Sequence, residues 1–171
     1  TETISQSVDV ANPKLWSVDS PNLYWVRTEI IQNGKVVDRT DSRFGIRYIA
    51  TNPNSGFYLN GVHTKLNGVC EHSDLGSLGM ETYQAAVDRR IRTLKKYGVN
   101  AIRTSHNPVS PEFIEACDRL GMLVFEEAFD QWLYSKNSDD YHNYFNKAAD
   151  GKTVVFDKAG NDNTNNDTSY I

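Results

Sequence analysis

Residues 100–132, NAIRTSHNPVSPEFIEACDRLGMLVFEEAFDQW, decide the fold, because they read as a strand, a helix and another strand. The apolar run VNAIR predicts a buried strand that reaches its end at Arg103. Ser110 and Pro111 predict the helix start, since serine can cap a helix and proline fits its first position. Gly121 ends this helix, and MLVFEEAFDQW is the next strand. This spacing indicates parallel strands joined by a crossover helix.

The same alternation extends upstream. A strand is expected near residues 65–70, and a helix follows it. The apolar residues of that helix recur at helical spacing: Tyr83, Val87, Ile91 and Leu94. Gly98 is placed as its C-terminal cap, while Glu81 near its start and Lys95 and Lys96 near its end suit the helix dipole. Three strands alternating with two helices predict an α/β unit.

The N-terminal region is expected to be all-β. Asn33-Gly34 separates NLYWVRTEII from KVVDRT, which is the strongest short hairpin signal. The runs SVDV (7–10) and RFGIRYIAT (43–51) read as further strands, so four strands would form part of a sandwich. Asn60-Gly61 predicts a second, shorter hairpin in FYLNGVH. The Asn- and Asp-rich run GNDNTNNDTSY predicts loop or disorder.

Composition excludes several classes of protein. Hydrophobic residues make up 39% and charged residues 23%, as in globular domains, and the net charge of -4 argues against a nucleic-acid partner. No stretch approaches the ~20 apolar residues of a membrane span, so no membrane association is expected. The N-terminus does not resemble a signal peptide, and the localisation stays open between periplasm, secretion and cytoplasm. Cys70 and Cys117 both lie in apolar contexts and are expected to be buried free thiols.

Polar residues follow each of the three parallel strands. They are Glu71, His72 and Asp74 after the first strand, Arg103, His106 and Asn107 after the second, and Glu126, Glu127, Asp130 and Trp132 after the third. The carboxyl ends of parallel strands form the binding face in barrels and open α/β sheets. Three such clusters at equivalent positions therefore predict a binding site.

Each member has a purely structural alternative. His72 could cap a loop, Trp132 could belong to the core, and Arg103 could pair with Glu126 or Glu127. The two adjacent glutamates point to opposite sides of a strand, so only one can face the interior. Zinc could bind two histidines and a carboxylate, but the sequence lacks His-x-His on one strand, and no metal site is expected. No nucleophile-elbow pattern surrounds the serine at position 105.

The ordered motifs NPKLWSVDSPNLY, RFGIR, FYLNG, LNGVCEHSDLG, NAIRTSHNP and EEAFDQW resemble glycoside hydrolase family 2, most of all its β-galactosidases from gut Bacteroidetes. The resemblance covers residues 12–144 and implies a partial immunoglobulin-like β-sandwich followed by the first βα units of a TIM barrel. It places the sandwich at 1–53, the barrel at 54–144 and an irregular tail or insertion at 145–171.

The resemblance also implies a reaction. Family members hydrolyse β-glycosides with retention, using two glutamates that this resemblance places outside the chain. It names no catalytic residue here and no cofactor, and it assigns the carbohydrate substrate to a set of binding residues. They are His72, Arg103, His106, Asn107, Glu127, Asp130 and Trp132. The sequence after Glu127 departs from the Asn-Ile-Glu-Thr-His run of ion-dependent members, so no such magnesium site is expected.

Two other readings stay open. Three strands cannot close a barrel, and their edges would need either a second copy in a homo-oligomer or the remainder of a longer chain. The isolated chain could therefore be a non-catalytic carbohydrate-binding or structural fragment. A metal-dependent barrel hydrolase is the weaker alternative. Among family specificities, galactose is favoured over glucuronic acid and mannose.

Overall fold

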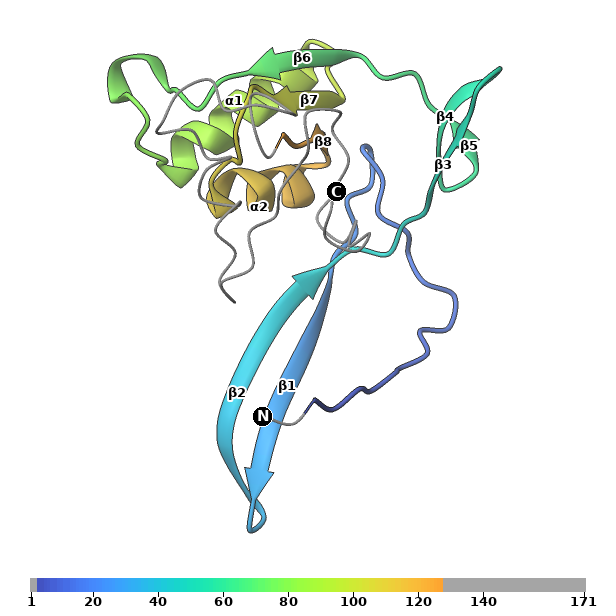
Figure 1. Cartoon of the computed structure of the whole chain (residues 1–171), viewed down its shortest axis with the longest axis vertical. Coiled ribbons are helices and arrows are strands. Elements are labelled where there is room, and N and C mark those ends of the chain that lie inside the picture. Colours follow the sequence, from blue (N-terminus) through green and yellow to red (C-terminus); the bar gives the residue numbers. More distant parts are fainter. Residues whose placement is uncertain (1–2, 128–171) are drawn as a thin grey trace, which may run out of the picture.

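The computed structural model describes residues 3–127, which form three small sheets and two helices (Figure 1). In chain order the elements are β1 (Tyr24–Gln32), β2 (Lys35–Phe44), β3 (Ile49–Asn52), β4 (Gly56–Leu59), β5 (Val62–His63), β6 (Gly68–Glu71), a 3-10 turn (Gly76–Leu78), α1 (Gln84–Lys96), β7 (Ala101–Thr104), α2 (Pro111–Leu120) and β8 (Leu123–Phe125). Neither helix within these residues is long and apolar enough to cross a membrane.

The parallel sheet has the order β6-β7-β8, and the crossover helices α1 and α2 connect its successive strands. Both helices pack on one face of the sheet, as predicted. Their contact with the sheet is a buried cluster in which the side chains of Ile91 and Ile102 are fully buried. The cluster also contains Val87, Phe113, Ala116, Cys117 and Met122. This apolar layer holds the βα units together without a disulfide, because both cysteines are free thiols.

The helix caps largely follow the sequence. The Ser110 hydroxyl accepts a 3.3 Å hydrogen bond from the Phe113 amide, and Gly121 ends α2 in the left-handed region at φ 78. Gly98 follows α1 at φ 81. The expected acidic start is wrong, because α1 begins at Gln84 and has no acidic residue in its first turn.

Lys95 has a different partner from the one predicted. Its ammonium donates hydrogen bonds to the carbonyls of Leu120 (2.6 Å), Gly121 (3.1 Å) and Val18 (2.5 Å). It therefore stabilises the C-terminus of α2 rather than that of its own helix, and it ties both to the N-terminal region. Burial lowers the pKa of Lys95, and the nearby carboxylate of Asp19 partly offsets this effect.

The opposite face of the sheet is covered only near the amino ends of its strands. Trp16 and Leu59 are buried there against Leu123, with Ala101 at the edge of the cluster. Since Ala101 and Leu123 begin β7 and β8, this cluster closes the amino end of the sheet. The carboxyl ends of the strands are left open on the same face.

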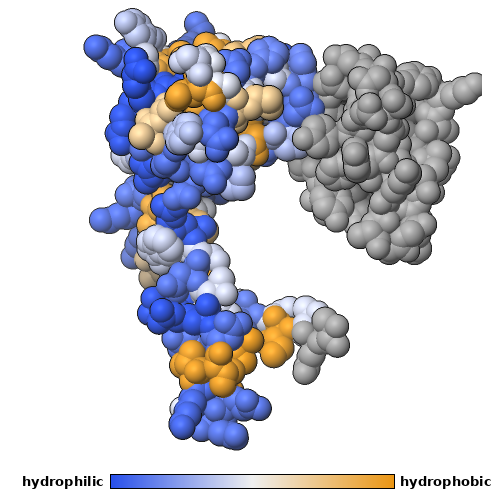
Figure 2. Space-filling view, turned by 90° about the vertical axis from the view of Figure 1, so that its left-hand side faces the viewer, coloured by the Kyte–Doolittle hydropathy of each residue, from blue (hydrophilic) through white to orange (hydrophobic). Residues whose placement is uncertain are grey.

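The β1–β2 hairpin extends away from this α/β unit (Figure 1). Its turn residues Asn33 and Gly34 both have positive φ, 52 and 75, as the predicted Asn-Gly turn requires. Asn60 and Gly61 likewise turn the β4–β5 hairpin, with φ 53 and 79. Figure 2 shows apolar side chains gathered on the arm that Figure 1 identifies as β1–β2. Among the exposed residues of this hairpin are Trp25, Val26, Ile30, Ile31, Val36 and Val37.

Several predictions for the N-terminal region are wrong. Residues 7–10 form no strand, because they make no backbone ladder with any described segment. The run at 43–51 is divided, since β2 ends at Phe44 and β3 begins at Ile49 and pairs with β4. The predicted four-stranded sheet is therefore a two-stranded hairpin plus a separate β3–β4–β5 sheet. Cys117 is buried as predicted, but Cys70 is exposed. Asp130, Trp132 and the 145–171 tail lie outside the described residues.

Candidate functional site

The alternation of β-strand side chains sorts the polar residues between the two faces of the parallel sheet. The register places Cys70, Arg103 and Phe125 side by side on three neighbouring strands. Val69, Ile102 and Val124, one position earlier, belong to the helix-facing core. Cys70, Arg103 and Phe125 therefore occupy the uncovered face, where all three are exposed. This open face at the carboxyl ends of the strands is the candidate site.

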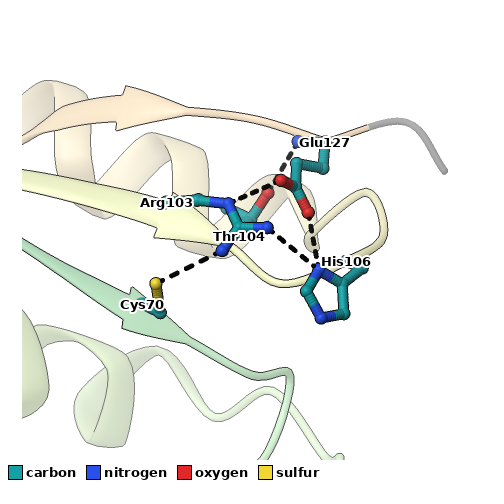
Figure 3. A network of polar contacts seen from close by, with 5 residues as sticks. All are labelled: Cys70, Arg103, Thr104, His106 and Glu127. Carbon is teal, nitrogen blue, oxygen red and sulfur yellow. Dashed lines mark hydrogen bonds and ion pairs between the residues drawn. The ribbon is translucent and has the colours of Figure 1, made fainter. Parts of the chain in front are cut away.

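Arg103, His106 and Glu127 form a polar network on this face (Figure 3). The Arg103 Nε donates to Glu127 Oε1 at 2.6 Å, and His106 Nδ1 lies 2.9 Å from Glu127 Oε2. Arg103 Nη1 also donates to the Cys70 sulfur at 3.4 Å. The network thus spans all three strands: Cys70 lies in β6, Arg103 in β7, and Glu127 two residues past β8.

The protonation of His106 follows from its partners. Its Nδ1 lies within reach of both Glu127 Oε2 and Arg103 Nη2, the latter at 3.2 Å. A carboxylate can only accept and a guanidinium can only donate, so one nitrogen cannot satisfy both. The shorter, charge-assisted bond to the carboxylate favours a proton on Nδ1. The Nε2 of His106 and the Nη2 of Arg103 are then left to bind a ligand.

The backbone of Glu127 is anchored from behind. Its amide donates a 2.9 Å hydrogen bond to the hydroxyl of Thr104, which is fully buried at the end of β7 (Figure 3). The neighbouring carboxylate of Glu126 instead accepts from the Val109 amide at 3.4 Å. Of the two adjacent glutamates, Glu127 is therefore the one on the open face and the partner of Arg103. The predicted pairing of Arg103 with one of these glutamates is confirmed.

Electrostatics keep this network ionised. Desolvation by itself would raise the pKa of Glu127, but the hydrogen bonds from His106 and Arg103 outweigh it and hold the pKa below its usual range. The pKa of Arg103 is raised, first by its hydrogen bond to Cys70 and then by Glu127. A fixed, charged pair of this kind can donate hydrogen bonds to hydroxyl groups and accept them in a defined geometry.

His72 and Asn107 border the network without joining it. The rings of His72 and His106 meet edge to face, with centroids 5.8 Å apart. Asn107 follows His106 directly and is half-buried, and its side chain makes no hydrogen bond within residues 3–127. Both residues lie at the carboxyl ends of β6 and β7, so five of the seven predicted binding residues fall in one part of the described chain.

Glu71 belongs to the other side of the sheet. Its carboxylate pairs with Arg90 of α1 at 2.8 Å, and Arg90 also donates to the backbone carbonyl of Asp74. Burial raises the pKa of Glu71, and the Arg90 charge offsets part of that effect. These contacts join the β6–α1 loop to α1, so Glu71 and Asp74 support the loop rather than the open face.

Metal binding finds no donor set among the described residues. Within residues 3–127, no three His, Cys, Asp or Glu side chains gather as ligands. His106 and Glu127 come together, but the guanidinium of Arg103 already lies against the same carboxylate and would repel a cation. The site offers hydrogen-bond donors and acceptors to a polar, uncharged ligand.

Two participants were missed from the sequence. Thr104 anchors Glu127, and Cys70 contacts Arg103. The signal for Cys70 was present, because parallel register places a residue of β6 next to Arg103 on the same face. No sequence pattern points to Thr104, since its role depends on where the chain passes after β8.

Comparisons with known proteins identify relatives for both parts of the chain. A family model described as "Glycosyl hydrolases family 2, TIM barrel domain" matches residues 51–161, and one described as "Glycosyl hydrolases family 2" matches residues 1–47. Beta-galactosidase BoGH2A of Bacteroides ovatus is 44% identical over 143 residues, which are 84% of this chain and 17% of that protein. A putative beta-glucuronidase of Formosa agariphila is 43% identical over 137 residues, 80% of this chain and 13% of that protein.

Solved structures agree with these matches. A glycosyl hydrolase family 2 member from Bacteroides cellulosilyticus superposes with a TM-score of 0.75 at 48% identity, covering 81% of this chain and 18% of that one. A beta-glycosidase from Bacteroides vulgatus also superposes with a TM-score of 0.75, at 42% identity and 81% coverage of this chain. This chain therefore spans less than a fifth of the length of the relatives described here.

Proposed function

Because this chain belongs to glycoside hydrolase family 2, we propose that the protein hydrolyses terminal β-linked galactosides with retention of configuration. The predicted fold is confirmed: the end of the family's immunoglobulin-like domain precedes the start of its TIM barrel. We place the domain boundary at residue 53 and the end of this barrel portion at residue 144.

The observation that supports the proposal best is the Arg103–Glu127–His106 network on the open face of β6, β7 and β8. Carboxyl ends of barrel strands carry the active site in TIM-barrel enzymes. We assign sugar binding to His72, Arg103, His106, Asn107 and Glu127, which the structure describes. Asp130 and Trp132 complete the proposed set beyond the described residues. The substrate is a carbohydrate, and no organic cofactor is required.

The two catalytic glutamates lie outside these residues in our proposal. Retaining glycosidases hold an acid/base and a nucleophile about 5 Å apart. Glu127 is instead committed to Arg103 and His106, which keep its pKa low. An acid/base needs a raised pKa to carry a proton at neutral pH. Glu127 therefore suits sugar binding and the orientation of neighbouring groups.

A β-glucuronidase is the second candidate, because one relative that is 43% identical carries that name. A uronic acid brings its own carboxylate, which needs positive charge that is not already neutralised. Among residues 3–127, the guanidinium on the open face is Arg103, and Glu127 already neutralises it. This charge balance favours the neutral galactosyl group over the glucuronyl group.

The covering of the sheet edges is a further part of the proposal. Within the described chain, β6 and β8 each pair on one side only, with β7. The remaining strands of a longer chain would pair with these edges and close the barrel, as in a TIM barrel. A homo-oligomer is the alternative source of the missing contacts.

The test is hydrolysis of a nitrophenyl β-glycoside panel (galactoside, glucuronide, mannoside and glucoside) by the full-length protein, with His106→Ala as the matched variant. We expect preferred turnover of the galactoside, lowered by the substitution. Preferred turnover of the glucuronide would replace the galactosidase proposal. Sugar binding without turnover on any substrate would support a carbohydrate-binding protein instead. The 171-residue chain by itself is expected to be inactive, and turnover by it would overturn the placement of the catalytic glutamates.

A further inference from the structure

Cys70 lies in the polar network although none of the proposed sugar-binding residues depends on it by sequence. It is exposed, it belongs to β6, and its backbone is in register with Arg103 of β7. Its sulfur accepts a hydrogen bond from Arg103 Nη1 at 3.4 Å (Figure 3). In parallel strands, paired residues extend to the same face, so this contact is built into the register of the sheet.

The guanidinium of Arg103 is held from two sides. Glu127 binds its Nε from the direction of β8, and Cys70 binds its Nη1 from the direction of β6. His106 cannot hold the third nitrogen while its Nδ1 donates to Glu127, as argued above. Removal of the sulfur would leave the Glu127 contact as the one firm anchor, about which the guanidinium plane could turn.

We propose that Cys70 is a positioning residue for the sugar site: its sulfur fixes the plane of the Arg103 guanidinium so that Nη2 faces the ligand. This inference rests on the proposed glycosidase function and adds to it a residue of β6 that touches no sugar itself. A long arginine side chain loses considerable rotational freedom when it is ordered, and a fixed orientation before binding reduces that cost at the moment of binding.

The first test compares Cys70→Ser, Cys70→Ala and Cys70→Val in the full-length protein. Serine retains a hydrogen-bond acceptor, alanine removes it, and valine removes it while filling the space. We expect kcat/KM for the preferred glycoside to fall about tenfold in the alanine and valine variants, mainly through a higher KM, and to stay within about threefold of wild type for serine. Equal losses in all three variants, or no loss in any, would overturn the proposal.

The second test uses crystal structures of the same variants and needs no activity. The Arg103 guanidinium should keep its orientation in the serine variant and turn away from the position in Figure 3 in the alanine and valine variants. An unchanged Arg103 in the alanine variant would refute the positioning role. If the wild-type protein hydrolyses none of the glycosides, the proposed function fails, and the orientation of Arg103 still decides the role of Cys70.

Alkylation with iodoacetamide provides an independent control. Cys117 is buried and its pKa is raised to about 12, first by desolvation, so it should not react in the folded protein. Alkylation of Cys70 should displace Arg103 and lower the activity of the wild-type protein, while the activity of the serine variant persists. Equal inactivation of both proteins would show that the effect arises at another thiol and would count against Cys70.

Discussion

The indole nitrogen of Trp16 donates a 2.7 Å hydrogen bond to the backbone carbonyl of Asp118, which lies 102 residues further along the chain. Trp16 is 2% exposed, and its ring packs with Leu59 and Leu123 at the amino end of the parallel sheet. This contact joins the N-terminal region to α2 and closes the face of the sheet opposite to the helices.

Substitution of Trp16 should therefore destabilise the junction. We expect Trp16→Ala to cost about 3–5 kcal/mol, because it leaves a large cavity, and Trp16→Phe to cost about 1–2 kcal/mol, because it removes the hydrogen bond. Thermal unfolding of the full-length protein measures both. The matched control is Trp25→Ala on the exposed hairpin, where the ring is 67% exposed and contacts Arg43. A loss at Trp25 as large as that at Trp16 would contradict the assignment of the junction.

Gly121 and Gly98 form a matched pair of helix-ending glycines. Both have positive φ, 78 and 81, but a Cβ at Gly121 would collide with the Val18 carbonyl and approach Lys95 Nζ, whereas Gly98 has nothing within 4 Å. Gly98→Ala should cost about 1–2 kcal/mol, from the left-handed backbone alone. Gly121→Ala should cost about 2–5 kcal/mol, since steric overlap is added to the same backbone cost. Equal melting temperatures for the two variants would show that the N-terminal segment does not lie against α2.

The adjacent glutamates offer a sharp test of which one faces the site. Glu127→Gln keeps the shape of the side chain but removes the charge that binds Arg103 and His106. We expect kcat/KM for the preferred glycoside to fall roughly 10- to 100-fold, as for the loss of a charged hydrogen-bond partner. Glu126→Gln should change it less than about threefold, because Glu126 accepts only a long bond from the Val109 amide. The reverse order of effects would place Glu126 on the open face.

The pH dependence of stability follows from the shifted carboxylates. The pKa of Glu127 is lowered in the folded state, so its stabilisation is complete above the unfolded pKa of a glutamate and is lost as the pH falls through the lowered value. The difference in melting temperature between wild type and Glu127→Gln should therefore narrow from pH 7 towards pH 3.

Glu71 provides the control of opposite sign. Burial raises its pKa, so the folded protein binds that proton more tightly than the unfolded chain does. Relative to Glu71→Gln, the wild type should gain stability as the pH falls from neutral through the raised value. Parallel pH trends for the two variants would mean that one of the carboxylates lies in a different environment.

The sequence by itself determined the local elements of this protein. Asn33-Gly34 and Asn60-Gly61 turn hairpins, Ser110 begins α2 and Gly121 ends it, as predicted. Each of these features depends on backbone preferences and hydrogen bonds within a few residues, and such signals survive in a sequence without its fold. The order of the motifs likewise sufficed to predict the family and the two-part architecture.

Only the tertiary structure decided which side chains meet. It selected Glu127 over Glu126 as the partner of Arg103, exposed Cys70 beside it, and directed Lys95 to the carbonyls of α2 and Val18. These contacts join residues 24, 33, 25 and 77 positions apart. They arise from strand register and packing between elements, and neither is encoded in the periodicity of one segment. The sheet brings the polar residues to one open face, and packing at its other end leaves that face accessible.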